Sequence, residues 1–268
     1  MNTQAVITGQ VSNSAAEIYD EFFVPALFGA WAEPLCEAAG LKPGQAVLDV
    51  ACGTGVTTRA AAERIGPKGR IVGLDRNAGM LEVARRRGSG IEWSQGLAED
   101  LPFAEGSFDS VLCQFGLMFF DDKVQAIREM RRMLRPGGRI ALTAWDDEEN
   151  SPGYARMIEL IDEMFGSDAA NALRAPFNLG QTERFRSLLV ESGLSDATTV
   201  TVSGSARFAS IREWVRMDVR GWTLAEFIDD AGFEALVEKA EKRLVQFVGT
   251  DGTVEFPAPA HIAVWECR

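Results

Sequence analysis

The chain has 268 residues, 46% hydrophobic and 25% charged, so it can bury a full core as one large domain or one domain with a lid. Asp and Glu outnumber Lys and Arg by 39 to 27, and the formal charge of −12 argues against nucleic acid as a partner. Residues 1–13 are polar and uncharged, which predicts neither a signal peptide nor a membrane span, and hence a cytoplasmic location. The four cysteines lack Cys-x-x-Cys spacing, so we expect free thiols and no metal site.

The first predicted elements are an N-terminal helix and a buried strand. The helix is expected to run to about residue 23, where Pro25 interrupts it before a second apolar piece with Phe28 and Trp31. Residues 47–50 then form a short apolar run. Such a run is typical of a strand that is buried on both faces of a parallel sheet.

A Gly-x-Gly turn, Gly53 and Gly55, follows this strand. Glycine allows the backbone to turn sharply and to approach a ligand closely, where any Cβ would obstruct it. Residues 56–65 are predicted to form a helix. The turn therefore lies between the carboxyl end of a strand and a helix N-terminus, the usual ligand crevice of an open α/β sheet.

The residues around the turn distinguish two classes of cofactor. A dinucleotide fingerprint requires a third glycine, but Thr58 stands at that position. Asp49 at the tip of the strand suits a ligand with an ammonium and a sulfonium better than a pyrophosphate. A second buried strand, residues 71–75, ends in Asp75, which is placed to accept hydrogen bonds from two ribose hydroxyls.

Five ordered blocks between about residues 19 and 145 resemble the core of class I S-adenosylmethionine-dependent methyltransferases. The similarity is strongest to the ubiquinone/menaquinone-biosynthesis (methyltransferase type 11) group. The resemblance implies an α/β fold: a Rossmann-like, mostly parallel seven-stranded sheet with an antiparallel last strand, helices on both faces and helical lid insertions. It also implies S-adenosyl-L-methionine as cofactor and S-adenosyl-L-homocysteine as product. The blocks are residues 48–55, 73–75, 96–103, 107–111 and 134–138.

The resemblance also assigns roles to single residues. Asp49 and Gly53 are expected toward the methionine portion of the cofactor, Asp75 at the ribose, and Ala98 and Glu99 beside the adenine. The cofactor-binding residues implied are Tyr19, Trp31, Asp49, Ala51, Cys52, Gly53, Gly55, Asp75, Arg76, Met80, Leu97, Ala98, Glu99 and Gln114.

One position departs from the family pattern. The family often has an acid that accepts a hydrogen bond from the adenine amine, and this chain has Leu97 there. Backbone groups and apolar contacts such as Met80 must then hold the adenine, unless Glu99 substitutes for the missing acid.

The remaining chain is expected to complete the sheet and to cover its carboxyl edge. Further strands are predicted at residues 108–114, 139–145, 198–202 and 261–267, and helices at residues 123–134, 154–165, 167–173, 182–192, 211–219 and 224–247. The predicted units are an N-terminal helical cap (1–35), a cofactor-binding core (36–149), a helical lid (150–179), and a completion of the sheet (180–268) with a second lid segment at about 206–227.

The acceptor pocket is expected at the end of the strand that closes with Gln114. Its predicted lining is Phe23, Phe115, Met118 and Trp145. The only histidine, His261, begins the closing strand at the cofactor edge and is a candidate base, because its pKa suits neutral pH. The alternative is a structural histidine with satisfied hydrogen bonds at the sheet edge.

We expect a methyltransferase that acts on O, C or N of a small apolar or aromatic acceptor, mainly by positioning and desolvation. Two alternatives stay open: a non-catalytic module that binds S-adenosylmethionine or its product, and a nicotinamide-dependent oxidoreductase, which would need the missing third glycine. Whether the chain forms a homodimer also stays open.

Overall fold

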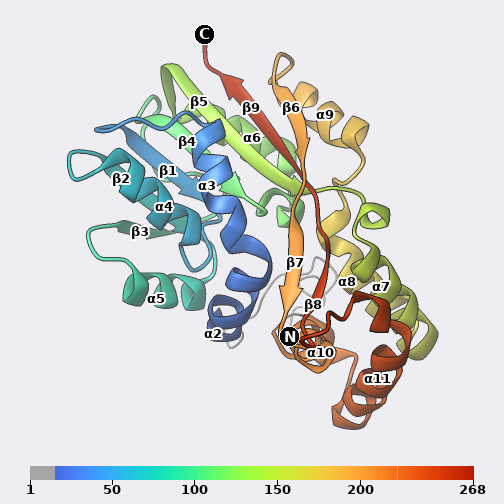
Figure 1. Ribbon diagram of the computed structural model, residues 1–268. Coiled ribbons are helices and arrows are strands. Elements are labelled where there is room, and N and C mark those ends of the chain that lie inside the picture. The colour runs from blue at the N-terminus through green and yellow to red at the C-terminus, as the bar shows by residue number, and fades with distance from the viewer. Residues whose placement is uncertain (1–15, 222) are drawn as a thin grey trace.

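The computed structural model describes residues 16–221 and 223–268, and its centre is a seven-stranded sheet (Figure 1). Neighbouring strands follow the order β3-β2-β1-β4-β5-β9-β6. All are parallel except β9, which is antiparallel to both β5 and β6. The prediction of a Rossmann-like sheet with an antiparallel last strand is therefore confirmed. The strands are β1 (Ala46–Val50), β2 (Arg70–Asp75), β3 (Glu92–Gln95), β4 (Phe108–Gln114), β5 (Leu134–Trp145), β6 (Thr198–Val202) and β9 (Ala260–Glu266).

The apolar sequence of β1 places it at the centre. All of its residues are buried, and it pairs with β2 on one side and β4 on the other. Asp49 is aligned with Gly73 of β2 and Leu112 of β4. Asp49 therefore lies in the central strand, close to the C-terminal ends of three neighbouring parallel strands.

Helices cover both faces of the sheet, with α3 packed against α4 and α6 against α9 (Figure 1). Asn77 accepts hydrogen bonds from the backbone N–H groups of Gly79 and Met80 and so caps α5, while Asp122 caps α6. Arginine clusters end both capped helices, where cations favour the helix dipole. These helices are α3 (Gly29–Ala38), α4 (Val56–Ile65), α5 (Ala78–Arg87), α6 (Lys123–Arg132) and α9 (Thr182–Glu191).

The N-terminal segment differs from the prediction. Residues 1–15 of the expected cap lie outside the described residues. From Ala16 the chain forms one short turn, α2 (Ala16–Ile18), and then a π-helix, η2 (Tyr19–Phe28), that leads into α3. Pro25 does not interrupt this path, because it lies within the wider π-helical turns.

A second layer lies beside the carboxyl edge of the sheet (Figure 1). It combines helices from two parts of the chain with a two-stranded sheet of β7 (Ser205–Phe208) and β8 (Val254–Pro257). Its aromatic core joins Tyr154, Phe208, Trp214 and Phe256. The helical pieces are η4 (Glu148–Asn150), α7 (Pro152–Phe165), α8 (Ser167–Arg174), η5 (Ala175–Phe177), α10 (Ile211–Arg220), η6 (Thr223–Glu226), α11 (Asp230–Arg243) and η7 (Val245–Phe247).

Three element predictions need correction. The helix predicted at 224–247 is η6, α11 and η7, because Asp229 caps a new helix by accepting from the N–H of Gly232. The strand predicted at 139–145 is longer, because β5 already begins at Leu134 and is irregular where it first pairs with β4. Strands β7 and β8 were not predicted, since each is only four residues long.

Candidate active site

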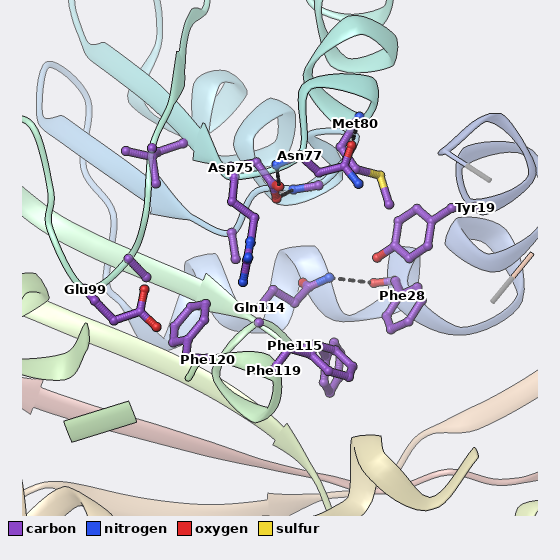
Figure 2. Close-up of a pocket in the computed structure, with 17 residues that line it drawn as sticks. Tyr19, Phe28, Asp75, Asn77, Met80, Glu99, Gln114, Phe115, Phe119 and Phe120 are labelled. Carbon is purple, nitrogen blue, oxygen red and sulfur yellow. Dashed lines mark hydrogen bonds between the residues drawn. The ribbon is translucent and has the colours of Figure 1, made fainter. Parts of the chain in front are cut away.

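A cavity of about 280 Å³ lies at the carboxyl edge of the sheet, where β1, β2 and β4 end (Figure 2). Asp75, Asn77, Met80 and Tyr19 lie along one side of it, with Glu99 and Phe120 toward the opposite end. Of the residues expected at the cofactor, those in its wall are Tyr19, Ala51, Gly53, Asp75, Arg76, Met80, Ala98, Glu99 and Gln114.

The turn after β1 forms the floor of this cavity. Ala51 (φ 57°), Gly53 (φ 55°) and Gly55 (φ 84°) all have left-handed backbone conformations. A Cβ on Gly53 would also lie 3.7 Å from the Tyr19 ring. Glycine adopts this conformation without strain at residues 53 and 55, whereas Ala51 adopts it with a Cβ.

Asp75 holds this turn to the next one. Its Oδ2 accepts a hydrogen bond from the N–H of Gly53 at 2.8 Å, and its Oδ1 accepts one from the N–H of Asn77 at 2.8 Å. Burial raises the pKa of Asp75, and these two backbone donors partly offset the rise. The carboxylate is thus fixed in the wall, with lone pairs left for ligand hydroxyls.

Asp49 lies beneath the wall. Its Oδ2 accepts a hydrogen bond from Thr58 Oγ1 at 2.6 Å, and its Oδ1 is buried with no partner among the described residues. Burial raises the pKa of Asp49 to about 7, although the Thr58 hydroxyl counteracts this. Thr58, which replaces the third glycine of a dinucleotide motif, therefore holds an acid in place of making room for a pyrophosphate.

The adenine is expected at the end of the cavity that carries Glu99. The position at which the family often has an acid is occupied there by Leu97. Leu97 is 48% exposed and is not part of the wall, which corrects its inclusion among the cofactor contacts. Glu99 is in the wall, and its Oε1 accepts hydrogen bonds from the N–H groups of Asp121 at 3.1 Å and Asp122 at 3.4 Å. Met80 and Ala98 add buried apolar surface.

Tyr19 and Gln114 provide polar groups on the N-terminal side. The Tyr19 ring stacks on Phe28 at a centroid distance of 5.1 Å. Burial, and next the charge of Asp75, raise the pKa of Tyr19 well above its ordinary value, so its hydroxyl remains a donor. Gln114 Nε2 donates to the carbonyl of Phe28 at 3.1 Å, while Gln114 Oε1 is buried with no partner among the described residues (Figure 2).

Other expected cofactor residues lie behind the wall. Gly55 starts α4, and the Cys52 thiol donates to the carbonyl of Gly53 in a 3.7 Å contact. Trp31 is buried edge-on against Phe115 and Trp145. The structure thus places these three residues beneath the cavity surface.

Of the residues predicted to line the acceptor pocket, only Phe115 is in this wall. Phe23 is fully buried beside Tyr19 and Phe28, so its predicted contact with a ligand is wrong. Met118 borders a surface groove, and Trp145 borders a second, small cavity.

His261 is not a base in this structure. It is completely buried, and its Nε2 lies 2.7 Å from the carbonyl oxygen of Gly180, so Nε2 carries the proton. Nε2 also approaches Asp146 Oδ1 at 3.3 Å, and Nδ1 lies 2.9 Å from Thr201 Oγ1. Both ring nitrogens are occupied, which corrects the candidate role and leaves the structural alternative.

Sequence reasoning missed several wall residues: Phe28, Leu74, Asn77, Gly96, Gly116, Phe119 and Phe120. Asn77 could have been found, since it stands two residues after Asp75 at the start of a helix, where Asn is a favoured cap. Phe119 and Phe120 lie close after Gln114 in the sequence, but no local pattern distinguishes a cavity-lining phenylalanine from a core one. Among the described residues no cluster suited to a metal ion is found, and none of their helices could cross a membrane.

Comparison with known proteins identifies the family. Residues 47–138 match the model of a methyltransferase domain. The chain is 36% identical over 208 residues to the ubiquinone/menaquinone biosynthesis C-methyltransferase UbiE of Pseudomonas syringae pv. tomato, across 70% of this chain and 81% of that protein. The chain belongs to the ubiquinone/menaquinone methyltransferase family of class I S-adenosylmethionine-dependent enzymes. The UbiE protein of Hahella chejuensis is 39% identical over 150 residues, 53% of this chain, and the match spans only 60% of that relative.

Solved structures share this fold. The YcgJ protein from Bacillus subtilis superimposes with a TM-score of 0.58 at 20% identity, over 89% of this chain and 98% of the neighbour. S-adenosylmethionine also fits the cavity chemically. Asp75 offers acceptors for ribose hydroxyls, and the unpartnered oxygens of Asp49 and Gln114 lie near the turn, where they suit a cationic amino acid portion.

Proposed function

We propose that this protein transfers the methyl group of S-adenosylmethionine to a small hydroxylated aromatic acceptor of the quinol type. The observation that carries this proposal is the main cavity's wall, in which the carboxylate of Asp75 is fixed by two backbone N–H groups. The relatives named above are quinone C-methyltransferases, which supports a quinol ring as acceptor.

The proposed roles of the wall residues follow from their geometry. Asp75 would bind the ribose hydroxyls, and Asp49 and Gln114 would favour the positive amino acid portion. When bound, the cofactor supplies an electrophilic methyl group on a sulfonium. The protein then has to hold the acceptor in line and exclude water, and such positioning accounts for ~7–11 kcal/mol in favourable systems.

An aromatic wall supports a planar acceptor. Phe28, Phe115, Phe119 and Phe120 all line the cavity, on the side away from Asp75 and Asn77 (Figure 2). Apolar surface of this kind binds ring systems and keeps water out, which strengthens electrostatic attraction inside the site.

The test is a survey of acceptors that follows release of S-adenosylhomocysteine. We expect turnover with 1,4-naphthalenediol and related reduced quinones, and none with the oxidised quinones, whose rings are poor nucleophiles. Binding of S-adenosylhomocysteine without turnover on any acceptor would favour the non-catalytic alternative. An absorbance assay that shows oxidation or reduction of a nicotinamide cofactor by this protein would contradict the proposed methyltransferase activity.

A further inference from the structure

A second cavity lies on the far side of the aromatic wall, between the sheet and the second layer. Its volume is about 20 Å³, and its lining is largely apolar and includes Leu27, Phe28, Trp145 and Phe177. Phe28 lines both cavities, and Phe115 of the first stacks on Trp145 of the second. The two cavities are therefore separated by the thickness of a few aromatic rings.

Two buried polar side chains point into this second cavity. Ser151 is 0% exposed and Asp218 is 2% exposed, and both line the cavity. Ser151 Oγ and Asp218 Oδ2 have no hydrogen-bond partner among the described residues. Ser151 precedes α7 as its N-cap residue, yet its hydroxyl makes no capping bond. The hydroxyl is thus available to a ligand in the cavity.

Asp218 has no cation to balance it. No salt bridge to it is found in the described part of the chain, and the side chains of Tyr154 and Trp214 interact with its carboxyl group while its Oδ2 stays without a hydrogen-bond partner. Burial raises the pKa of Asp218 well above its ordinary value, and these two neighbours only partly offset the rise. A buried acid with an unused oxygen costs stability, so packing does not explain its presence.

We propose that Asp218 and Ser151 bind a hydroxyl group of the methyl acceptor, with Asp218 Oδ2 accepting its hydrogen bond and Ser151 Oγ donating one to its oxygen. This inference rests on the proposed function and specifies the acceptor side of the same site. A hydroxyl group can donate one hydrogen bond and accept others, and the acceptor Asp218 Oδ2 and the donor Ser151 Oγ match these two abilities. An aromatic hydroxyl held here places its ring against Phe28, which also lines the cofactor cavity, so the Phe28 ring has to turn aside for the acceptor to reach the methyl group.

The ring can enter only if the cavity widens. At about 20 Å³ it has room for about one water molecule in this structure. Phe177 of η5 lines both this cavity and the surface groove outside it. Displacement of η5 would therefore open a path from the groove, and the acceptor hydroxyl would replace a water at Ser151 and Asp218.

The binding test uses equilibrium dialysis of 1-naphthol and of naphthalene against protein loaded with S-adenosylhomocysteine. We expect the wild type to prefer 1-naphthol by at least about tenfold, and Ser151→Ala and Asp218→Asn each to lose most of that preference. Affinity for S-adenosylhomocysteine should change by less than about twofold. Ser192→Ala is the matched control, since Ser192 is equally buried but its hydroxyl donates to the carbonyl of Leu188.

Thermal unfolding separates a binding role from a structural one. Ser151→Ala removes a hydroxyl without a partner and should leave the melting temperature unchanged or raise it, whereas Ser192→Ala should lower it. If Asp218→Asn fails to fold, Ser151→Ala still decides the question.

The outcomes are distinguishable. An unchanged preference for 1-naphthol in Ser151→Ala would overturn the inference, as would a wild type that binds both compounds equally and keeps only a water in the cavity. A wild type that binds 1-naphthol through these residues but methylates no acceptor would overturn the proposed function and leave the binding site standing.

Discussion

The ring of Phe115 stacks on the indole of Trp145 with a centroid distance of 3.9 Å and an interplanar angle of 14°. Phe115 follows β4 with a left-handed backbone (φ 53°), an uncommon conformation for a bulky residue, and Trp145 ends the adjacent strand β5. The strained residue thus turns its ring onto Trp145 and, at the same time, into the wall of the cofactor cavity. This pair forms part of the wall between the two cavities.

Asp75→Ala should weaken binding of S-adenosylhomocysteine by about 1.5–3 kcal/mol, the usual range for hydrogen bonds to a charged group. The variant loses both the proposed ribose acceptor and the bonds to Gly53 and Asn77. Calorimetry measures the affinity, with Asp162→Ala on the exposed face of α7 as control. Unchanged affinity in a folded Asp75→Ala variant would remove Asp75 from the ribose site.

Binding of S-adenosylmethionine should release protons near pH 6, because a cationic ligand favours ionised Asp49. The pKa of Asp49 is raised from 3.8 to about 7, so the carboxyl is mostly protonated at that pH in the free protein. Affinity should therefore rise as the pH approaches 7 and then level off. Titration calorimetry in two buffers of different ionisation enthalpy gives the number of protons released on binding. The Asp49→Asn variant should release fewer protons than the wild type. Equal release by both proteins would contradict this role.

The same shift has an opposite effect on the stability of the free protein. The folded state binds the Asp49 proton more tightly than the unfolded state, so this residue should reduce stability as the pH rises from about 4 through 7. Denaturant unfolding at these pH values, with Asp49→Asn as the comparison, measures the effect. A contribution from Asp49 that increases stability across this range would show that burial does not govern its titration.

An inosine-type analogue of the cofactor should bind within roughly tenfold of the adenosine form, or about 1.4 kcal/mol. Leu97 is exposed and outside the wall, and two backbone N–H groups already hold Glu99 Oε1, so we expect only a small contribution from an acid at the adenine amine. Competition against S-adenosylhomocysteine measures the ratio. Much stronger discrimination would mean that Glu99 or a backbone carbonyl recognises the amine.

His261→Gln should lower the free energy of unfolding by about 1–3 kcal/mol without changing the pH profile of turnover. The substitution disturbs the buried contacts with Gly180 and Thr201 but removes no group from the cavity. Chemical denaturation and initial rates at several pH values test the two parts. Loss of a rate-limiting ionisation in this variant would restore His261 as a base.

Hydrogen exchange in residues 150–179 and 19–31 should slow when S-adenosylhomocysteine binds. Phe28 and Phe177 belong to these two segments and line the cavities, so closure of the segments over a bound ligand would order them. Strand β1 is buried and should already be protected in the free protein. Mass spectrometry of exchanged peptides measures this. Equal protection with and without ligand would show a fixed wall.

Local sequence patterns were sufficient to predict which strand lies at the centre of the sheet and at which edge of the sheet the cofactor binds. The apolar residues 47–50, the glycine turn and Asp75 are local patterns, and strand ends of a parallel sheet meet at one edge whatever packs around them. The mostly parallel sheet and its antiparallel last strand came with the family resemblance, whereas the order of the strands is known only from the structure.

Which side chains line the cavities could not be fully predicted from the sequence and is known only from the packing of the folded chain. Tyr19 and Phe23 were both expected to contact a ligand, but in the π-helical segment Tyr19 stacks on Phe28 and lines the cavity, whereas Phe23 is fully buried in the core. Ser151 and Asp218 are far apart in sequence and meet only because α7 and α10 share one layer. Burial and partners of a side chain depend on such distant neighbours, and no short sequence pattern encodes them.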